Sequence, residues 1–396
     1  MRAIGRDPIF IERAAGAEIT DVDGNTYVDY VCSWGPLVLG HGNPAVIEAI
    51  TDAAALGTSY GAPTAGEVEL AELVTQRMPA VDMMRMTSSG TEASMRAIRL
   101  ARAATCRETL VKFAGAYHGH VDGLLAQAGS GLATQGIPAS PGVPESATRA
   151  TIIVPWNDEA AVRAAFAEHD VAALIAEPYA ANMGLVVPEP GFLDLLRELA
   201  TEHGALLIFD EVITGFRVSA GGEQELTGVL PDITVMGKVI GGGLPAAAYG
   251  ASIDLMNRIA PAGDVYQAGT LSGNPLAVAA GRATLAQLDE DAYVHLAATT
   301  EALASGLREA AGDRPVQVEW APGLLTVFFS EAPVRDYAGA AACDADAYAA
   351  WCRALLARGV YPPPSQFEAW FPSLAHTHDH VARTLEVAAA AFSEIG

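Results

Sequence analysis

The chain has 396 residues, of which 51% are hydrophobic and 18% are charged, and its formal net charge is −24 at pH 7. This length exceeds a typical single domain, and the composition is that of a compact α/β protein rather than of a disordered chain. The excess of 47 acidic over 23 basic residues argues against a nucleic-acid or anionic-membrane partner.

The cysteines and the N-terminus carry no sign of export. The four cysteines are scattered and form no CxxC pair, so we expect neither a disulfide framework nor a metal site. The first residues contain no apolar run typical of a signal peptide, and no stretch reaches membrane-spanning length. These features predict a cytoplasmic protein with no membrane partner.

Two patterns of secondary structure follow one another along the chain. Residues 8–30 alternate apolar and polar side chains around Asp23-Gly24, which predicts a β-meander with a tight hairpin. From about Val46, helical stretches alternate with short apolar strands. The expected elements in this part are helices at 65–78, 91–104 and 192–202, and strands at 110–113, 152–154, 171–176, 205–209 and 233–236. This alternation is typical of a parallel sheet with helices on both faces.

The C-terminal part has a different pattern. A long helix from about Pro275 leads into helices at 292–311, 346–358 and 380–393, with two strands near 316 and 326–329. We therefore predict three parts: an N-terminal segment 1–45 that joins the small domain, a large α/β domain 46–285, and a small α+β domain 286–396.

Residues 126–147 fit neither pattern. The segment is rich in Gly, Ala, Ser and Pro and is too long for an ordinary connection in a compact domain. It is either disordered or a functional lid, and we favour the lid.

Several unusual runs fall where predicted parallel strands end, which is the edge at which open α/β sheets bind ligands. Residues 87–92 (Thr-Ser-Ser-Gly-Thr-Glu) join a strand to a helix. Their backbone N–H groups and the positive end of the helix suit a phosphate. An ordinary helix N-cap explains the same run equally well.

Aromatic and histidine residues follow another strand. Tyr117 lies where it could stack on a planar ring, although a plain core or rim position is the simpler explanation. His118 and His120 are two residues apart and would point to opposite faces of a strand, so we expect hydrogen-bonded histidines rather than a metal site. The run at 376–380 contains three histidines, and helix capping explains it better than a metal.

The most specific signal is a carboxylate and a lysine at the ends of consecutive strands. Asp210 ends an almost wholly apolar strand, and burying its charge is costly unless a cation meets it. Lys238 follows the next predicted strand and precedes three glycines. A lysine amine attacks a carbonyl only when it is unprotonated. A carboxylate for the ring nitrogen and a lysine that forms an imine are the requirements for binding pyridoxal 5'-phosphate.

With these residues in view, the chain resembles the class III, fold type I pyridoxal-phosphate-dependent aminotransferase family, and most narrowly its aminomutases. The runs that carry the resemblance extend over nearly the whole chain, at 33–36, 89–93, 117–120, 129–133, 140–143, 177–178, 210–212, 214–217, 237–243, 266–275 and 367–369. The resemblance implies a mostly parallel seven-stranded sheet covered by helices, and a smaller α+β domain built from both chain ends.

The resemblance also implies roles for individual residues. Lys238 would form the imine and move protons, and Asp210 would keep the ring nitrogen protonated. The other expected cofactor contacts are Ser89, Gly90 and Thr91 at the phosphate, Tyr117 and Val212 on the two ring faces, Asn182 near the 3-hydroxyl, and Gly269 and Thr270 at the phosphate from the neighbouring subunit. The expected substrate residues are Ser33, Trp34, Glu368 and Arg2. A homodimer with shared active sites follows, and no metal is expected.

The implied reaction is isomerisation of a small amino aldehyde. The pyridoxamine 5'-phosphate form of the cofactor would give its nitrogen to glutamate-1-semialdehyde and recover the other nitrogen, which yields 5-aminolevulinate for porphyrin biosynthesis. The lid would retain the intermediate between the two halves of the reaction.

Two alternatives remain. A transaminase with a separate amino donor fits the same cofactor residues. There are two reasons to consider it. The family commonly has a smaller residue where this chain has Tyr179, and the chain begins near the end of the family's longer N-terminal segment. A non-catalytic binding module is the third reading, and the presence of Asp210, Lys238 and the phosphate residues argues against it.

Overall fold

The central element of the protein, seen in a computed structural model that describes residues 1–126 and 140–395, is a seven-stranded sheet with the order β4-β10-β9-β8-β7-β5-β6. Its strands are β4 (Met83–Thr87), β5 (Thr109–Phe113), β6 (Thr151–Val154), β7 (Val171–Ala176), β8 (Leu206–Glu211), β9 (Ile233–Met236) and β10 (Ala247–Ala251). Strands β5 to β9 pair in parallel, whereas β10 is antiparallel to both of its neighbours. The predicted fold class is confirmed.

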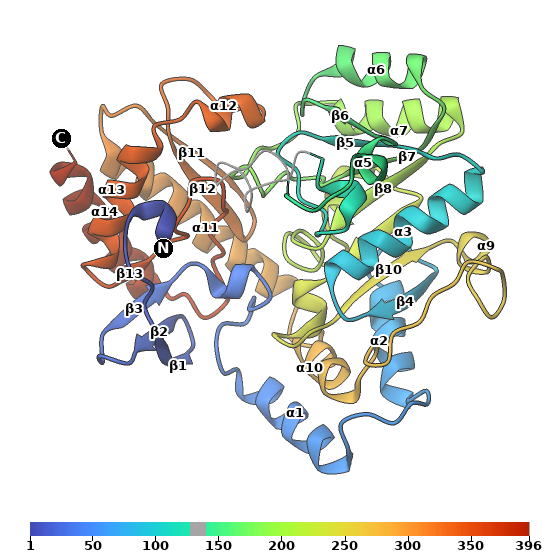
Figure 1. The fold of residues 1–396 in the computed structure, drawn as a ribbon. Helices are drawn as coiled ribbons and strands as arrows, with labels where there is room; N and C mark the ends of the chain where they lie inside the picture. Colours follow the sequence, from blue (N-terminus) through green and yellow to red (C-terminus); the bar gives the residue numbers. More distant parts are fainter. Residues whose placement is uncertain (127–139, 396) are drawn as a thin grey trace.

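Both faces of this sheet are buried, which explains why its central strands are almost continuously apolar. Alternate residues of a strand point to opposite faces. Leu207 and Phe209 of β8 pack into a core with helices α6 and α7, whereas Ile208 between them packs into a second core with helix α3. Figure 1 shows the sheet between these helices, which are α3 (Gly90–Thr105), α6 (Glu159–Glu168) and α7 (Phe192–His203).

The two ends of the chain pack together beside the large sheet (Figure 1). A four-stranded sheet has the order β1-β2-β3-β13, so the last of three N-terminal strands pairs with a strand near the C-terminus. The Tyr30 hydroxyl also bonds Thr384 across 2.8 Å. The elements of this part are β1 (Ile11–Ala15), β2 (Glu18–Asp21), β3 (Thr26–Asp29), β11 (Val316–Ala321), β12 (Leu324–Phe329), β13 (Val360–Tyr361), α11 (Glu290–Ala311), α12 (Tyr337–Ala341), α13 (Ala345–Leu356) and α14 (His378–Glu394). The domain boundaries near residues 45 and 285 remain predictions.

Shorter elements connect these parts. They are α1 (Pro44–Leu56), α2 (Ala65–Thr75), α5 (Glu145–Thr148), α8 (Glu223–Thr227), α9 (Ile253–Met256), α10 (Pro275–Leu285), and the 3-10 turns η1 (Arg2–Ile4), η2 (Cys32–Trp34), η3 (Asp122–Leu124) and η4 (Lys238–Gly241). None of the helices in the described ranges has the length and apolar character needed to cross a membrane.

The sequence pattern did not predict strand β10, and it also did not predict helix α6. The residues of β10, Ala-Ala-Tyr-Gly-Ala, are mostly small, and alanine and glycine have low intrinsic preference for strands. The strand forms because Tyr249 pairs opposite Arg85 of β4 on one side and Val235 of β9 on the other. Tertiary pairing therefore overrides local preference here.

Candidate active site

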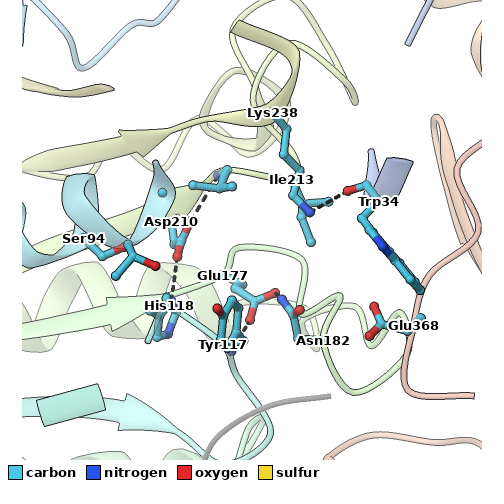
Figure 2. A pocket seen from close by; sticks show the side chains of 14 residues that line it. Trp34, Ser94, Tyr117, His118, Glu177, Asn182, Asp210, Ile213, Lys238 and Glu368 are labelled. Carbon is cyan, nitrogen blue, oxygen red and sulfur yellow. Dashed lines mark hydrogen bonds and ion pairs between the residues drawn. The ribbon is translucent and has the colours of Figure 1, made fainter. Parts of the chain in front are cut away.

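A cavity of about 480 Å³ lies where the parallel strands end, and Figure 2 shows its side chains. Residues after β5, β7, β8 and β9, the start of α3 and the turn η2 all contribute to it. The lining residues are Trp34, Gly90, Thr91, Ser94, Tyr117, His118, Gly119, Glu177, Asn182, Asp210, Val212, Ile213, Lys238 and Glu368. Most of the residues predicted from the sequence therefore meet in one place.

Lys238 is the first residue of η4 and has a positive φ of 49°, which is uncommon for a residue with a side chain. Its Nζ donates a hydrogen bond of 2.6 Å to the carbonyl oxygen of Trp34. Burial lowers the pKa of Lys238 to about 8, the nearby carboxylate of Glu368 opposes this change, and the Arg217 cation adds to it. A useful fraction of the amine is therefore unprotonated near neutral pH.

Asp210 is held by a buried histidine. The Nδ1–H of His118 donates to Asp210 Oδ2 across 2.8 Å, and the backbone N–H of Val212 donates to the other oxygen across 3.1 Å. His118 is 1% exposed, and its Nε2 has no hydrogen-bond partner. These two hydrogen bonds hold the Asp210 carboxylate in one orientation at the end of β8 (Figure 2).

Glu177, at the end of β7, is a second buried carboxylate that holds neighbouring pocket residues in place by hydrogen bonds. Its two oxygens accept hydrogen bonds from the backbone N–H groups of Tyr117 and Ala181, both at 2.9 Å, and from the Asn182 side chain at 2.8 Å. Burial raises the pKa of Glu177, while His118 and the two backbone donors lower it. This one carboxylate fixes the positions of Tyr117 and Asn182 at the pocket.

The N-terminus of α3 faces the cavity with Gly90 and Thr91. Ser89 is the N-cap, and its hydroxyl accepts a hydrogen bond from the N–H of Glu92 at 3.2 Å. Capping is thus observed, and the exposed N–H groups with the positive helix end remain suited to an anion. The Thr91 hydroxyl shares a hydrogen bond with His120 Nδ1 at 3.0 Å.

Five predicted residues do not line this cavity. Ser89 caps the helix beside it, and the side chain of Ser33 is exposed in η2. Gly269 and Thr270 border a different surface hollow. Arg2 is exposed in η1, which packs against α13, so the structure does not bring it to the pocket.

The sequence interpretation missed five pocket residues, which are Ser94, His118, Gly119, Glu177 and Ile213. Glu177 follows a wholly buried apolar strand, so the argument that selected Asp210 would have selected it too. The prediction that His118 and His120 make hydrogen bonds is confirmed, because His118 bonds Asp210 and His120 bonds Thr91. Residues 1–126 and 140–395 contain no group of side chains arranged as metal ligands. Capping by the 376–380 run is observed, with Thr377 and His380 forming a capping box. The predicted lid falls mostly at 127–139, outside the described residues.

Comparisons with known proteins agree with this geometry. The family model for class III aminotransferases matches residues 2–391. A glutamate-1-semialdehyde 2,1-aminomutase from Desulforudis audaxviator is 54% identical over 396 residues, which cover 99% of this chain and 92% of that protein. Among solved structures, an omega-transaminase from Sphaerobacter thermophilus has a TM-score of 0.91 and 33% identity, covering 98% of this chain and 91% of that one. A variant glutamate-1-semialdehyde-aminomutase from Pseudomonas aeruginosa PAO1 in complex with PMP has a TM-score of 0.88 and 30% identity, covering 98% and 88%.

Proposed function

The chain belongs to the class III aminotransferase family, and we propose that it converts glutamate-1-semialdehyde, (S)-4-amino-5-oxopentanoate, to 5-aminolevulinate in tetrapyrrole biosynthesis. The observation that carries this proposal is the 54% identity, over nearly the whole of both chains, to a protein named for that reaction. The fold alone does not decide the substrate, because one fold supports many reactions.

The pocket fits pyridoxal 5'-phosphate. The fixed carboxylate of Asp210 suits a protonated ring nitrogen, and the N-terminus of α3 at Gly90 and Thr91 suits a phosphate. Tyr117 and Val212 lie on the pocket wall, where each can cover one face of a planar ring. Asn182 lines the same pocket and would serve the 3-hydroxyl, and Lys238 would supply the amine that holds the aldehyde.

When bound, the cofactor supplies an electron sink that stabilises negative charge on the carbon bearing the amine. Asp210 retains the proton on the ring nitrogen that makes this possible, and His118 holds Asp210 in place. Because its pKa is about 8, Lys238 can accept a proton at Nζ and return it within the pocket. The Trp34 carbonyl orients this amine.

The substrate end of the pocket is formed by Trp34 and Glu368. Glu368 is the carboxylate that most strongly favours a positive charge on Lys238, so it can also meet an ammonium group of the substrate. Substrate and product are isomers that differ in the positions of one amine and one carbonyl. The reaction therefore requires no second amino donor, which distinguishes it from a transamination between two molecules.

We further propose a homodimer in which Gly269 and Thr270 complete the phosphate site of the neighbouring subunit. They border a surface hollow together with Tyr60. Large apolar side chains near this surface are exposed, including Val68 at 57% and Leu271 at 54%. An apolar surface of this kind favours coverage by another chain, and a second copy would bring the two residues to a site that they cannot reach in their own subunit.

A single-turnover assay tests the reaction. The enzyme in its pyridoxamine 5'-phosphate form, mixed with glutamate-1-semialdehyde and no amino donor, should yield 5-aminolevulinate. A transaminase with a separate donor is the second candidate, because the omega-transaminase structure has the higher TM-score. Failure to form 5-aminolevulinate, together with amine exchange between another donor and acceptor, would establish that candidate instead.

Loss of an imine absorption band in Lys238→Ala tests whether the protein is an enzyme of this class at all. Protein that binds no cofactor after reconstitution, and shows no such band with Lys238 intact, would favour a binding module.

A further inference from the structure

Arg217 is a fully buried cation without a counter-ion. Its side chain is 0% exposed, and no carboxylate among the described residues forms an ion pair with it. Its guanidinium instead donates to three backbone carbonyl oxygens, those of Gly35, Gly323 (3.2 Å) and Pro372 (3.0 Å), and its Nε has no partner. Burying an unpaired cation is costly, so its presence behind the pocket calls for a physical reason.

The three carbonyls belong to segments that are far apart in the sequence. Gly35 ends the turn η2 near the N-terminus, Gly323 lies in the turn between β11 and β12, and Pro372 follows Phe371 near the C-terminus. Arg217 itself follows β8, the strand that carries Asp210. A guanidinium has five donors in a rigid fork and can join such segments, whereas an ammonium group cannot match that geometry.

One of these segments is a strained turn that contacts the reactive lysine. Cys32, Ser33 and Trp34 have φ values of 44°, 58° and 66°, so three successive residues with side chains are left-handed. Such residues are individually unfavourable and persist only where the surroundings hold them. The carboxylate of Asp29 binds the start of the turn through the N–H groups of Val31 and Cys32, and Arg217 binds its end at Gly35. The result is that the Trp34 carbonyl faces Lys238 Nζ at 2.6 Å.

Phe371 lies against both cations. Its ring centroid is 5.3 Å from the guanidinium carbon of Arg217 and 5.6 Å from Lys238 Nζ. A Cβ added at Gly35 would lie 2.9 Å from the Phe371 ring and 3.2 Å from Lys238 Cδ, so the packing leaves no space between these groups. The charge of Arg217 therefore acts on Lys238 across the closely packed Phe371 ring and Gly35, with no space between them for solvent.

We infer that Arg217 is a positioning residue for Lys238: it holds the Trp34 carbonyl against the amine and electrostatically disfavours protonation of that amine. The inference rests on the proposed role of Lys238 as the reactive amine. It concerns the preparation of the lysine and not the identity of the substrate.

The charges around Lys238 agree with this role. Burial is the main cause that lowers its pKa, and Arg217 acts in the same direction, whereas Glu368, Glu177 and Asp210 raise it. The other titratable side chains that line the pocket are Tyr117 and His118. Arg217 is thus the cation that offsets a pocket rich in carboxylates.

The test measures the titration of Lys238 directly. Full-length protein freed of cofactor is trace-labelled with acetic anhydride across a pH series, and the Lys238 peptide is quantified by mass spectrometry. In Arg217→Gln, the pKa of Lys238 should rise by about one pH unit or more, because both charges lie within 5.6 Å of the Phe371 ring centroid and are therefore at most about 11 Å apart, taken at an effective dielectric constant of about 20. The imine absorption of the holoenzyme should titrate at a higher pH as well. Arg77→Gln is the matched control, because Arg77 also donates to a carbonyl, that of Leu285 at 3.0 Å, and has an unpartnered nitrogen.

Arg217→Lys separates charge from position. It keeps the cation, so the pKa of Lys238 should stay near the parent value. It loses the fork, so the labelling rate of the unprotonated amine at high pH should rise roughly twofold to tenfold, which is the effect of weakening one hydrogen bond.

An unchanged pKa in folded Arg217→Gln would overturn the electrostatic part of the inference. If that variant does not fold, an unchanged high-pH labelling rate in Arg217→Lys would still overturn the positioning part. Neither result depends on the substrate, so the single-turnover assay for 5-aminolevulinate remains an independent test of the proposed reaction.

Discussion

The hydrogen bond between His118 and Asp210 should determine how tightly the cofactor binds. The bond is 2.8 Å long and buried, with His118 1% and Asp210 6% exposed. In His118→Leu, Asp210 loses this donor and its carboxylate is no longer fixed toward the ring nitrogen. A hydrogen bond to a charged group contributes ~1.5–3 kcal/mol, so the dissociation constant of pyridoxal 5'-phosphate should increase by roughly tenfold to 150-fold.

His118→Asn is the matched control, because the asparagine amide nitrogen can occupy nearly the same position as His118 Nδ1 and can donate to the same oxygen. Its affinity should stay within about threefold of the parent, well below the loss expected from an unmade charged hydrogen bond. Both constants follow from titration of the cofactor-free protein, monitored by fluorescence. Equal losses in the Leu and Asn variants would refute the argument, since they would show that ring size at position 118 matters and the hydrogen bond does not.

Three further perturbations follow from the structure. Glu223 is 1% exposed and has an oxygen without a partner, and burial raises its pKa to about 8. The stability that depends on its proton is therefore lost as the pH rises from about 4.5 to 8. Glu223→Gln should raise the free energy of unfolding, measured in urea, by ~1–3 kcal/mol at pH 8 but by little at pH 5. An equal gain at both pH values would contradict this sign. Gly35→Ala should reduce kcat/KM, because the added methyl group would meet Phe371 and Lys238. Gly24 also has a positive φ, of 86°, but has open space around it, so Gly24→Ala should affect stability alone. Comparable kcat/KM values for the two variants would count against the packing argument. Mixing inactive Lys238→Ala with an inactive Gly269→Asp variant should restore activity, since a mixed dimer contains one intact site if Gly269 serves its neighbour; no recovery in demonstrated mixed dimers would assign Gly269 to its own subunit.

The sequence identified residues whose chemistry is unusual for their position. Asp210 and Lys238 are charged groups beside buried apolar strands, and parallel strands bring their ends to one edge. Glu177 meets the same criterion after β7, yet its role became clear only from the three N–H groups that it binds. Pattern alone finds a misplaced charge, whereas the partner that explains the charge lies far away in the chain.

The left-handed turn at Cys32–Trp34 had no signal in the sequence. Cysteine, serine and tryptophan do not favour positive φ, and local preference predicts a different backbone at these positions. The turn exists because Asp29 and Arg217 bind its two ends, and Arg217 is 182 residues from Gly35 along the chain. Such tertiary causes are absent from any short window of sequence.

The distribution of charge around the pocket connects these observations. Lys238 is the single lysine or arginine among the lining residues of the described chain, and the protein carries a net charge of −24. An anionic phosphate must therefore be held mainly by neutral donors at the N-terminus of α3, whose N–H groups and dipole act over a short range and are fixed by the fold. The same scarcity of cations leaves Arg217, behind the pocket wall, as the charge that can oppose three nearby carboxylates at the lysine. Placing that cation out of contact with solvent and ligand keeps it from binding the phosphate or the substrate carboxylate itself, so its field remains directed at Lys238.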